Sequence, residues 1–203
     1  HSPMPRPLTI LLAWLLPLAC LPQAPSQEKL SLPPSPVDAL QGGWDTNIAN
    51  TQAAEWKNAN ANVPNNQMVQ LNWFRSEYNA KASNNNGELE AADKVLLNTI
   101  ANDIKATAPG SFEQHLADYF LEFPSKAAFA DLDAANALAP ERTELLAPML
   151  SKSMLDGDAA ELRKWSAEMD ARGAIAPPLR AAAADVLLSM PDNGILFTNG
   201  DMD

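Results

Sequence analysis

Three oxygen-bearing side chains near the carboxyl end are the residues whose types suggest chemistry most directly. Asn199, Asp201 and Asp203 lie in the string NGDMD, and amide and carboxylate oxygens are the ligands that Mg²⁺, Mn²⁺ and Ca²⁺ take in proteins. Carboxylates two residues apart on an extended chain point to opposite sides unless a turn brings them together. A divalent cation also takes more ligands than this string offers. We therefore favour a solvated acidic turn, with a divalent-metal site, for binding or for metal-assisted catalysis, as the alternative.

Cysteine and histidine are too scarce for most other catalytic sites. Cys20 is the single cysteine, and His115 is the single histidine apart from the first residue. Disulfides, thiolate zinc sites and Cys-His catalysis within the chain are therefore excluded. Ser111 and Asp118 are close enough to His115 in sequence to share its helix, where they cannot flank an imidazole as a catalytic triad requires. We expect a surface or packing histidine.

The remaining acidic pairs are also poor candidates for catalysis. The two members of each pair are two residues apart in the sequence, and side chains at that spacing do not lie on the same face of a helix. The pairs are Glu88 with Glu90, Asp131 with Asp133, and Asp156 with Asp158. The sequence contains no Gly-rich phosphate loop, nucleophile elbow or metalloprotease helix. We predict a protein without catalytic residues or a cofactor, unless the carboxyl-terminal turn binds a divalent cation.

Aromatic side chains in the amino-terminal half form the second candidate site. Trp44, Trp56, Trp73 and Tyr78 have broad faces of the kind that stack on sugars and peptides. In a core otherwise made of Ala and Leu, such residues more often fill space between helices. We favour that structural interpretation, with a groove for a glycan or small ligand as the alternative.

Net charge limits the partners. The formal charge is −11, from 25 acidic and 14 basic residues, and the basic residues are scattered, with Arg163 and Lys164 as the single adjacent pair. Nucleic acids and anionic lipid surfaces bind through clusters of Lys and Arg. We exclude a nucleic-acid partner and expect membrane contact only through a lipid anchor.

The first 26 residues are typical of an export signal preceded by a few extra residues. Arg6 is followed by the apolar run Leu8–Ala19, which is shorter than the roughly 20 residues that span a bilayer. Cleavage after Ser26, at an A-x-S site, leaves a soluble protein. Residues 16–20 (LPLAC) resemble a lipobox instead, which implies a lipid on Cys20. We expect an exported protein, periplasmic, secreted or anchored to the outer membrane, and slightly favour the free form.

Composition and periodicity predict an all-α fold. Ala and Leu dominate and Gly is sparse, with 8 residues, which favours helices. We expect a Pro-rich tether at 27–36, a helical domain at 37–190, and a strand with an acidic turn at 191–203. About eight helices with short connections indicate antiparallel hairpins, at residues 48–62, 68–82, 88–108, 111–122, 125–138, 140–154, 158–172 and 177–188.

One stretch of the helical domain resembles a known repeat. Residues 125–172 contain AANALAPERTELLAPMLSKSMLDGDAAELRKWSAEM, an Ala-rich helix ending at Leu138-Ala139-Pro140, a second helix, and a third after Gly157-Asp158. This order is similar to a tetratricopeptide-like unit, without the Trp and Gly-Tyr positions of its first helix. The resemblance implies an array of hairpins whose concave face binds a peptide or protein.

The carboxyl-terminal string ILFTNGDMD, from Ile195 to Asp203, resembles a segment written ILFTNGDxD in envelope proteins of Bacteroidota. Some of these belong to a multi-spanning family related to protein O-mannosyltransferases, in which more sequence follows. This sequence lacks a membrane-spanning part, so the resemblance implies no glycosyltransferase activity, and we expect a truncated chain or a fragment. Ile195 to Thr198 is predicted to be a short β-like run.

The function expected from these features is that of a non-enzymatic binding or scaffold module of the cell envelope. Its partner is expected to be an envelope protein or peptide. The alternatives are the metal site at Asn199, Asp201 and Asp203 and the glycan or small-ligand groove at the Trp residues.

Overall fold

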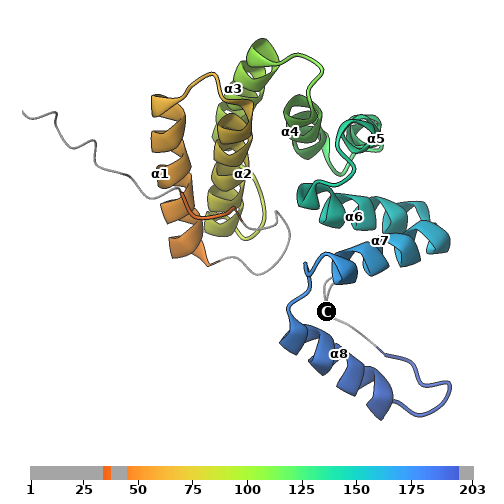
Figure 1. The fold of residues 1–203 in the computed structure, drawn as a ribbon. Helices are drawn as coiled ribbons and strands as arrows, with labels where there is room; N and C mark the ends of the chain where they lie inside the picture. The colour runs from red at the N-terminus through yellow and green to blue at the C-terminus, as the bar shows by residue number, and fades with distance from the viewer. Residues whose placement is uncertain (1–33, 38–44, 197–203) are drawn as a thin grey trace, which may run out of the picture. The chain divides into compact units, whose positions relative to one another are not determined.

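A computed structural model describes residues 34–37 and 45–196 of the chain. These residues form eight α-helices and one 3₁₀ turn and contain no strand (Figure 1). The elements are α1 (Thr46–Asn62), α2 (Gln67–Asn84), α3 (Ala91–Thr107), α4 (Phe112–Glu122), α5 (Ala128–Leu138), η1 (Thr143–Leu145), α6 (Leu146–Asp156), α7 (Ala159–Ala171) and α8 (Pro177–Ser189). The predicted all-α fold is confirmed. Ile195 and Leu196 are irregular, and the rest of the expected β-like run lies outside the described residues.

Side chains at the helix starts explain why the boundaries are readable from the sequence. Asp45, Asn66 and Asp158 cap α1, α2 and α7 by accepting hydrogen bonds from backbone N–H groups of the first turn. Ser111 caps α4 by accepting from the N–H of Gln114. Ser111 followed by Gln114 is the sequence pattern of a capping box, in which the Gln114 side chain would accept from the N–H of Ser111. In the structure it accepts instead from the N–H of Gly110, at 2.7 Å.

The helices pack as antiparallel neighbours. α1 packs along α2, α4 along α5, and α6 along α7 (Figure 1). α2 also contacts α3 and α4, so three helices cover it. Short connections force consecutive helices to run in opposite directions. The hairpin arrangement predicted from the sequence is therefore present.

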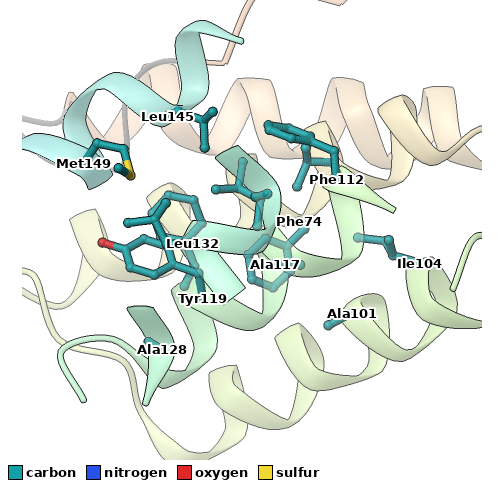
Figure 2. Packing of buried hydrophobic residues seen from close by; sticks show 14 of the residues in the cluster. Phe74, Ala101, Ile104, Phe112, Ala117, Tyr119, Ala128, Leu132, Leu145 and Met149 are labelled. Carbon is teal, nitrogen blue, oxygen red and sulfur yellow. The ribbon is translucent and has the colours of Figure 1, made fainter. Parts of the chain in front are cut away.

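The core consists of a large cluster centred on α2 to α6 (Figure 2) and a small one of Ala49, Ala53 and Ala80 from α1 and α2. Its fully buried members include Leu71, Phe74, Leu97, Ile100, Ile104, Leu116, Tyr119, Leu132 and Leu145. Most lie at the three- and four-residue steps of an amphipathic helix.

Apolar periodicity in the sequence predicts that Leu96 lies on the buried face of α3 and Met154 on that of α6, and the structure corrects both predictions. In α3, Leu97 is fully buried, whereas Leu96 is only partly buried. In α6 the buried face continues from Met149 to Ser153, because a step of four residues stays on one face and a step of five does not. Met154 is consequently 43% exposed, and the Ser153 hydroxyl donates to the backbone carbonyl of Met149 at 2.8 Å.

Because α2 is covered by three helices, it buries polar side chains as well as apolar ones. Its buried polar residues are Gln70, Arg75, Ser76, Glu77 and Asn79. The amide nitrogen of Gln70 is paired: it donates to the backbone carbonyl of Pro64 at 2.7 Å and to the hydroxyl of Thr107 at 3.1 Å. The Gln70 Oε1 atom has no hydrogen-bond partner among the described residues. Buried polar groups stabilise a fold only when they are paired as the Gln70 nitrogen is.

Tyr119 lies at the centre of an aromatic group. Its ring centroid is 5.0 Å from that of Phe120, 5.5 Å from that of Phe123 and 6.5 Å from that of Phe129. Burial, with a smaller contribution from Tyr78, raises the pKa of the Tyr119 hydroxyl. Within the described residues this hydroxyl has no hydrogen-bond partner.

The last helix differs from the others. α8 contains no buried residue, and its apolar side chains face solvent, with Leu188 83% exposed. An ion pair links it to α7, from Arg180 Nη1 to Asp170 Oδ1 at 2.5 Å. None of the described helices combines the length and hydropathy needed to cross a bilayer.

The unpaired hydroxyl of Tyr119 gives a stability prediction. We expect Tyr119→Phe to leave the free energy of unfolding unchanged or to raise it by up to about 1 kcal/mol, because a buried hydroxyl without a partner costs free energy. We expect Tyr119→Ala to lower it by about 3–5 kcal/mol, because the substitution opens a cavity. Urea unfolding followed by circular dichroism measures both. A loss above about 1.5 kcal/mol for Tyr119→Phe would show that the hydroxyl is paired.

Candidate functional site

The candidate site is a pocket of about 330 Å³ at the meeting point of several elements. Its walls come from α1, α2, α4, η1, the first turn of α6 and the short segment 34–37. The lining residues are Pro36, Val37, Trp56, Asn72, Arg75, Phe120, Thr143, Glu144, Ala147 and Pro148. The pocket thus depends on packing between parts of the chain up to about a hundred residues apart.

The wall formed by η1 and α6 follows from one proline. Pro148 lacks a backbone N–H, and in the first turn of a helix that N–H has no intrahelical acceptor. Accordingly α6 begins at Leu146, directly after the 3₁₀ turn, and Pro148 lies in its first turn. A proline at this point of an apolar helical pattern predicts either a kink or a short first turn. The structure has the short first turn, and Thr143 and Glu144 of the preceding 3₁₀ turn line the pocket.

An ion-pair network fixes the charged wall. The Arg142 guanidinium donates to Glu144 twice, from Nε to Oε2 at 3.1 Å and from Nη2 to Oε1 at 2.6 Å. Its third nitrogen, Nη1, donates to Glu113 Oε1 at 3.2 Å. The ring of Phe112 lies 4.2 Å below the guanidinium carbon. Such a forked, stacked geometry is specific to arginine.

The network sets the charge state of the pocket. Burial acts to raise the pKa of Glu144, but hydrogen bonds from Arg142 and from its own backbone N–H, with the charges of Arg142 and Arg75, hold that pKa below its usual value. The hydrogen bond to Glu144 in turn raises the pKa of Arg142, against the opposing effect of burial. Both groups are therefore ionised at neutral pH. A carboxylate held in this way is a poor general base.

Arg75 is the second cation of the pocket. It lies on α2, three residues after Asn72, so both side chains share one face of the helix. Arg75 is only 7% exposed, and its charge attracts the carboxylate of Glu144. The lining also includes apolar side chains, among them Phe120 and Pro148.

The segment 34–37 closes one side of the pocket. Trp56 donates from Nε1 to the backbone carbonyl of Ser35 at 2.9 Å, and Gln52 donates from Nε2 to the carbonyl of Pro36 at 2.8 Å. The backbone N–H of Ser35 donates to Glu55 Oε2 at 3.1 Å. Residues assigned to a tether from the sequence are thus bound to the surface of α1.

Of the aromatic residues proposed for a ligand groove, the three that the structure describes do not line one pocket. Trp56 lines the pocket. Trp73 donates its indole N–H to Glu77 Oε1 at 3.1 Å, and Tyr78 packs on Phe120, with ring centroids 6.0 Å apart. Trp44 lies outside the described residues. Among the described members of that set, Trp56 is therefore the one placed to contact a ligand in the pocket.

Sequence reasoning missed the polar residues of the pocket. None of these residues belongs to a sequence motif. Asn72 and Arg75 precede the other two, Thr143 and Glu144, by 68 to 72 residues in the sequence. One signal existed for Arg75, because it falls beside Phe74 in the apolar repeat of its helix, where a cation needs a special environment.

The hydrogen-bond partner of His115 lies on the next helix. Its Nδ1 lies 2.7 Å from Oδ1 of Asp131, which joins α4 to α5. Ser111 is occupied as the cap of α4, and Asp118 Oδ2 accepts from the amide of Gln114 at 3.0 Å. His115 and Asp131 therefore connect two helices, and the two nearby side chains lie in separate contacts.

The proposed metal ligands Asn199, Asp201 and Asp203 lie outside the described residues, as do Cys20 and the cleavage site after Ser26. Within residues 34–37 and 45–196, no group of three or more His, Cys, Asp or Glu side chains is arranged to hold a metal ion.

No protein-family model, curated protein or solved structure matches the chain. Function is therefore inferred from the pocket and its surroundings.

The lowered pKa of Glu144 gives a pH prediction. A carboxylate whose pKa is lower in the folded chain stabilises the fold above its unfolded pKa of about 4.3, and this contribution disappears as the pH falls through the folded pKa. We expect Glu144→Gln to lower the free energy of unfolding at pH 7. The difference from the unaltered chain should shrink steadily below about pH 4. Urea unfolding at a series of pH values measures it.

Glu141→Gln is the matched control, because Glu141 is an exposed carboxylate in the same connection. If both variants show the same pH dependence, the ion-pair network does not hold the Glu144 carboxylate as described.

Proposed function

We propose that the helical body is a non-enzymatic binding module that accepts a peptide or a segment of another protein in its pocket. The observation that carries this proposal is the mixed lining of the pocket. Apolar surfaces of Trp56, Phe120 and Pro148 line the same pocket as the polar groups of Arg75 and Asn72. Ligand pockets typically combine apolar walls with a few placed polar groups.

The charge state of the pocket favours binding over catalysis. Glu144 is held as an anion and Arg142 as a cation by their mutual hydrogen bonds. Groups fixed in this way do not exchange protons readily at neutral pH. Thr143 contributes a hydroxyl to the pocket, and the neighbouring carboxylate, Glu144, is already bound by Arg142. The lining therefore suits recognition.

The size and polarity of the pocket favour a peptide. About 330 Å³ is near the lower end of the range for ligand sites, which suits one or two side chains of a longer molecule. Arginine and asparagine side chains donate to backbone carbonyls, while proline and tryptophan surfaces pack on apolar side chains. The tetratricopeptide-like character of residues 125–172 agrees with this proposal, because such arrays bind peptides.

A glycan or small ligand is the second candidate, since Trp56 lines the pocket. Its indole N–H is already bound to Ser35, which leaves the ring surface for stacking. The metal-site alternative rests on Asn199, Asp201 and Asp203 alone.

Site-specific cross-linking tests the proposal. A photoreactive phenylalanine analogue in place of Ala147, which lines the pocket, is expected to give discrete protein adducts after illumination of cells that make the protein. Adding Trp56→Ala should weaken those adducts, because the substitution removes one wall.

Val95 is the matched control position, since it lies on α3 and is 68% exposed. Adducts that are equally strong from position 95, or a complete lack of protein adducts from position 147, would contradict a protein-binding pocket. An adduct with a carbohydrate at position 147 would favour the second candidate.

We propose that the protein acts in the cell envelope, because residues 1–26 are typical of an export signal. We expect the intact mass of the protein isolated from the envelope to equal that of a chain beginning at Gln27. A mass that includes a diacylglyceryl group on Cys20 would assign the lipid-anchored form, and Cys20→Ser would then abolish anchoring. A full-length mass in the cytoplasmic fraction would contradict export.

A further inference from the structure

The contact between residues 34–37 and α1 has the form of a bound peptide. The row of contacting side chains consists of Gln52, Glu55 and Trp56 of α1. Glu55 and Trp56 follow Gln52 by three and four residues, so both lie on the same side of the helix as Gln52. All three bind backbone atoms of the segment: the carbonyls of Ser35 and Pro36 accept, and the N–H of Ser35 donates. The row therefore recognises the conformation of the segment through its main chain.

The prolines prepare the segment for this contact. Pro34 and Pro36 have a fixed φ, and Ser35 is restricted to extended conformations because a proline follows it. In such a polyproline-type chain the carbonyls point outward and are unpaired within the segment. A row of donors along a helix can then bind them with little loss of conformational freedom.

The segment leads to the pocket without filling it. Pro36 and Val37 line the pocket, and about 330 Å³ remains open beside them. Ser35 and Pro36 are exposed, and Trp56 is partly exposed, so the two hydrogen bonds of Ser35, with Trp56 and with Glu55, lie where water competes with them. The third, from the buried Gln52 to Pro36, is partly buried. Hydrogen bonds of this kind are individually weak, so the segment can be replaced by another peptide.

We propose that the row of Gln52, Glu55 and Trp56, together with the adjoining pocket, is a site for an extended, proline-containing peptide of a partner protein. Residues 34–37 occupy the row as an internal ligand and compete with that peptide. This inference rests on the proposed binding function and specifies the chemistry of its ligand. An internal competitor lowers the apparent affinity in proportion to the fraction of molecules in which the site is open.

The test uses the full chain and a fluorescein-labelled peptide with the sequence of residues 30–37, LSLPPSPV. We expect the double variant Pro34→Gly, Pro36→Gly to bind this peptide about ten-fold more tightly than the unaltered chain in fluorescence anisotropy, because glycine makes the internal competitor flexible. A peptide in which glycine replaces each proline should bind more weakly than LSLPPSPV.

Two matched substitutions in the double variant locate the site. Trp56→Phe removes an indole N–H that binds the segment, and we expect about five-fold weaker peptide binding. Trp73→Phe removes an indole N–H that binds Glu77 instead, and we expect unchanged binding. Circular dichroism checks the helical content of each variant. Pro36→Ala replaces the double variant if the latter loses helix.

Equal affinity of the unaltered and substituted chains, or equal effects of Trp56→Phe and Trp73→Phe, would overturn the inference. Such a result combined with protein adducts from position 147 would leave the pocket as a protein-binding site for another type of ligand. Loss of the adducts as well would refute both proposals.

Discussion

The covering of α2 by three helices is the constraint on which the rest of the structure depends. A helix packed on one side can turn its polar residues to water, but α2 contacts α1, α3 and α4. Its polar side chains must therefore be paired inside the protein. The amide of Gln70 reaches Pro64 and Thr107, and the carboxylate of Glu77 accepts from Trp73. The bonds of Gln70 tie α2 to the connection before it and to the end of α3, whereas the bond between Trp73 and Glu77 lies within α2.

The same constraint produces the pocket. Arg75 lies on the part of α2 that faces η1 and α6, and a buried cation there requires nearby negative charge. Glu144 supplies it, but the hydrogen bonds of that carboxylate go to Arg142, which also binds Glu113 on α4. The cations Arg75 and Arg142 are thus held close to two carboxylates. These belong to Glu113 and Glu144, and the four charges largely neutralise one another. A ligand is consequently selected less by net charge than by shape and by individual hydrogen bonds.

The helices could be predicted from the sequence and the pocket could not, because helices depend on residues close together in the chain and the pocket depends on residues far apart. Helix starts depend on residues a few positions apart, so Ser111 and Asp158 can be recognised as caps in the sequence, whereas the cap at Asp45 is seen only in the structure. Apolar periodicity likewise predicted most of the core, and it failed at Met154 by one position at the edge of a face. The pocket depends on pairs such as Arg75 with Glu144, whose separation of 69 residues leaves no local pattern. His115 is similar, because its partner Asp131 is 16 residues away and on the next helix.

The amino-terminal segment shows how a region without a core of its own can still acquire structure. Residues 34–37 have too few apolar side chains to bury, and composition alone predicts a tether. Their prolines, however, remove most of the conformational entropy that binding would otherwise cost. A few hydrogen bonds from Trp56, Gln52 and Glu55 are then enough to dock the backbone on α1. Because these bonds read only main-chain atoms, the surface that holds the segment has no means of distinguishing it from another chain of the same conformation. Selectivity for a partner must therefore come from the side chains that enter the adjoining pocket, where Arg75, Asn72 and Glu144 lie.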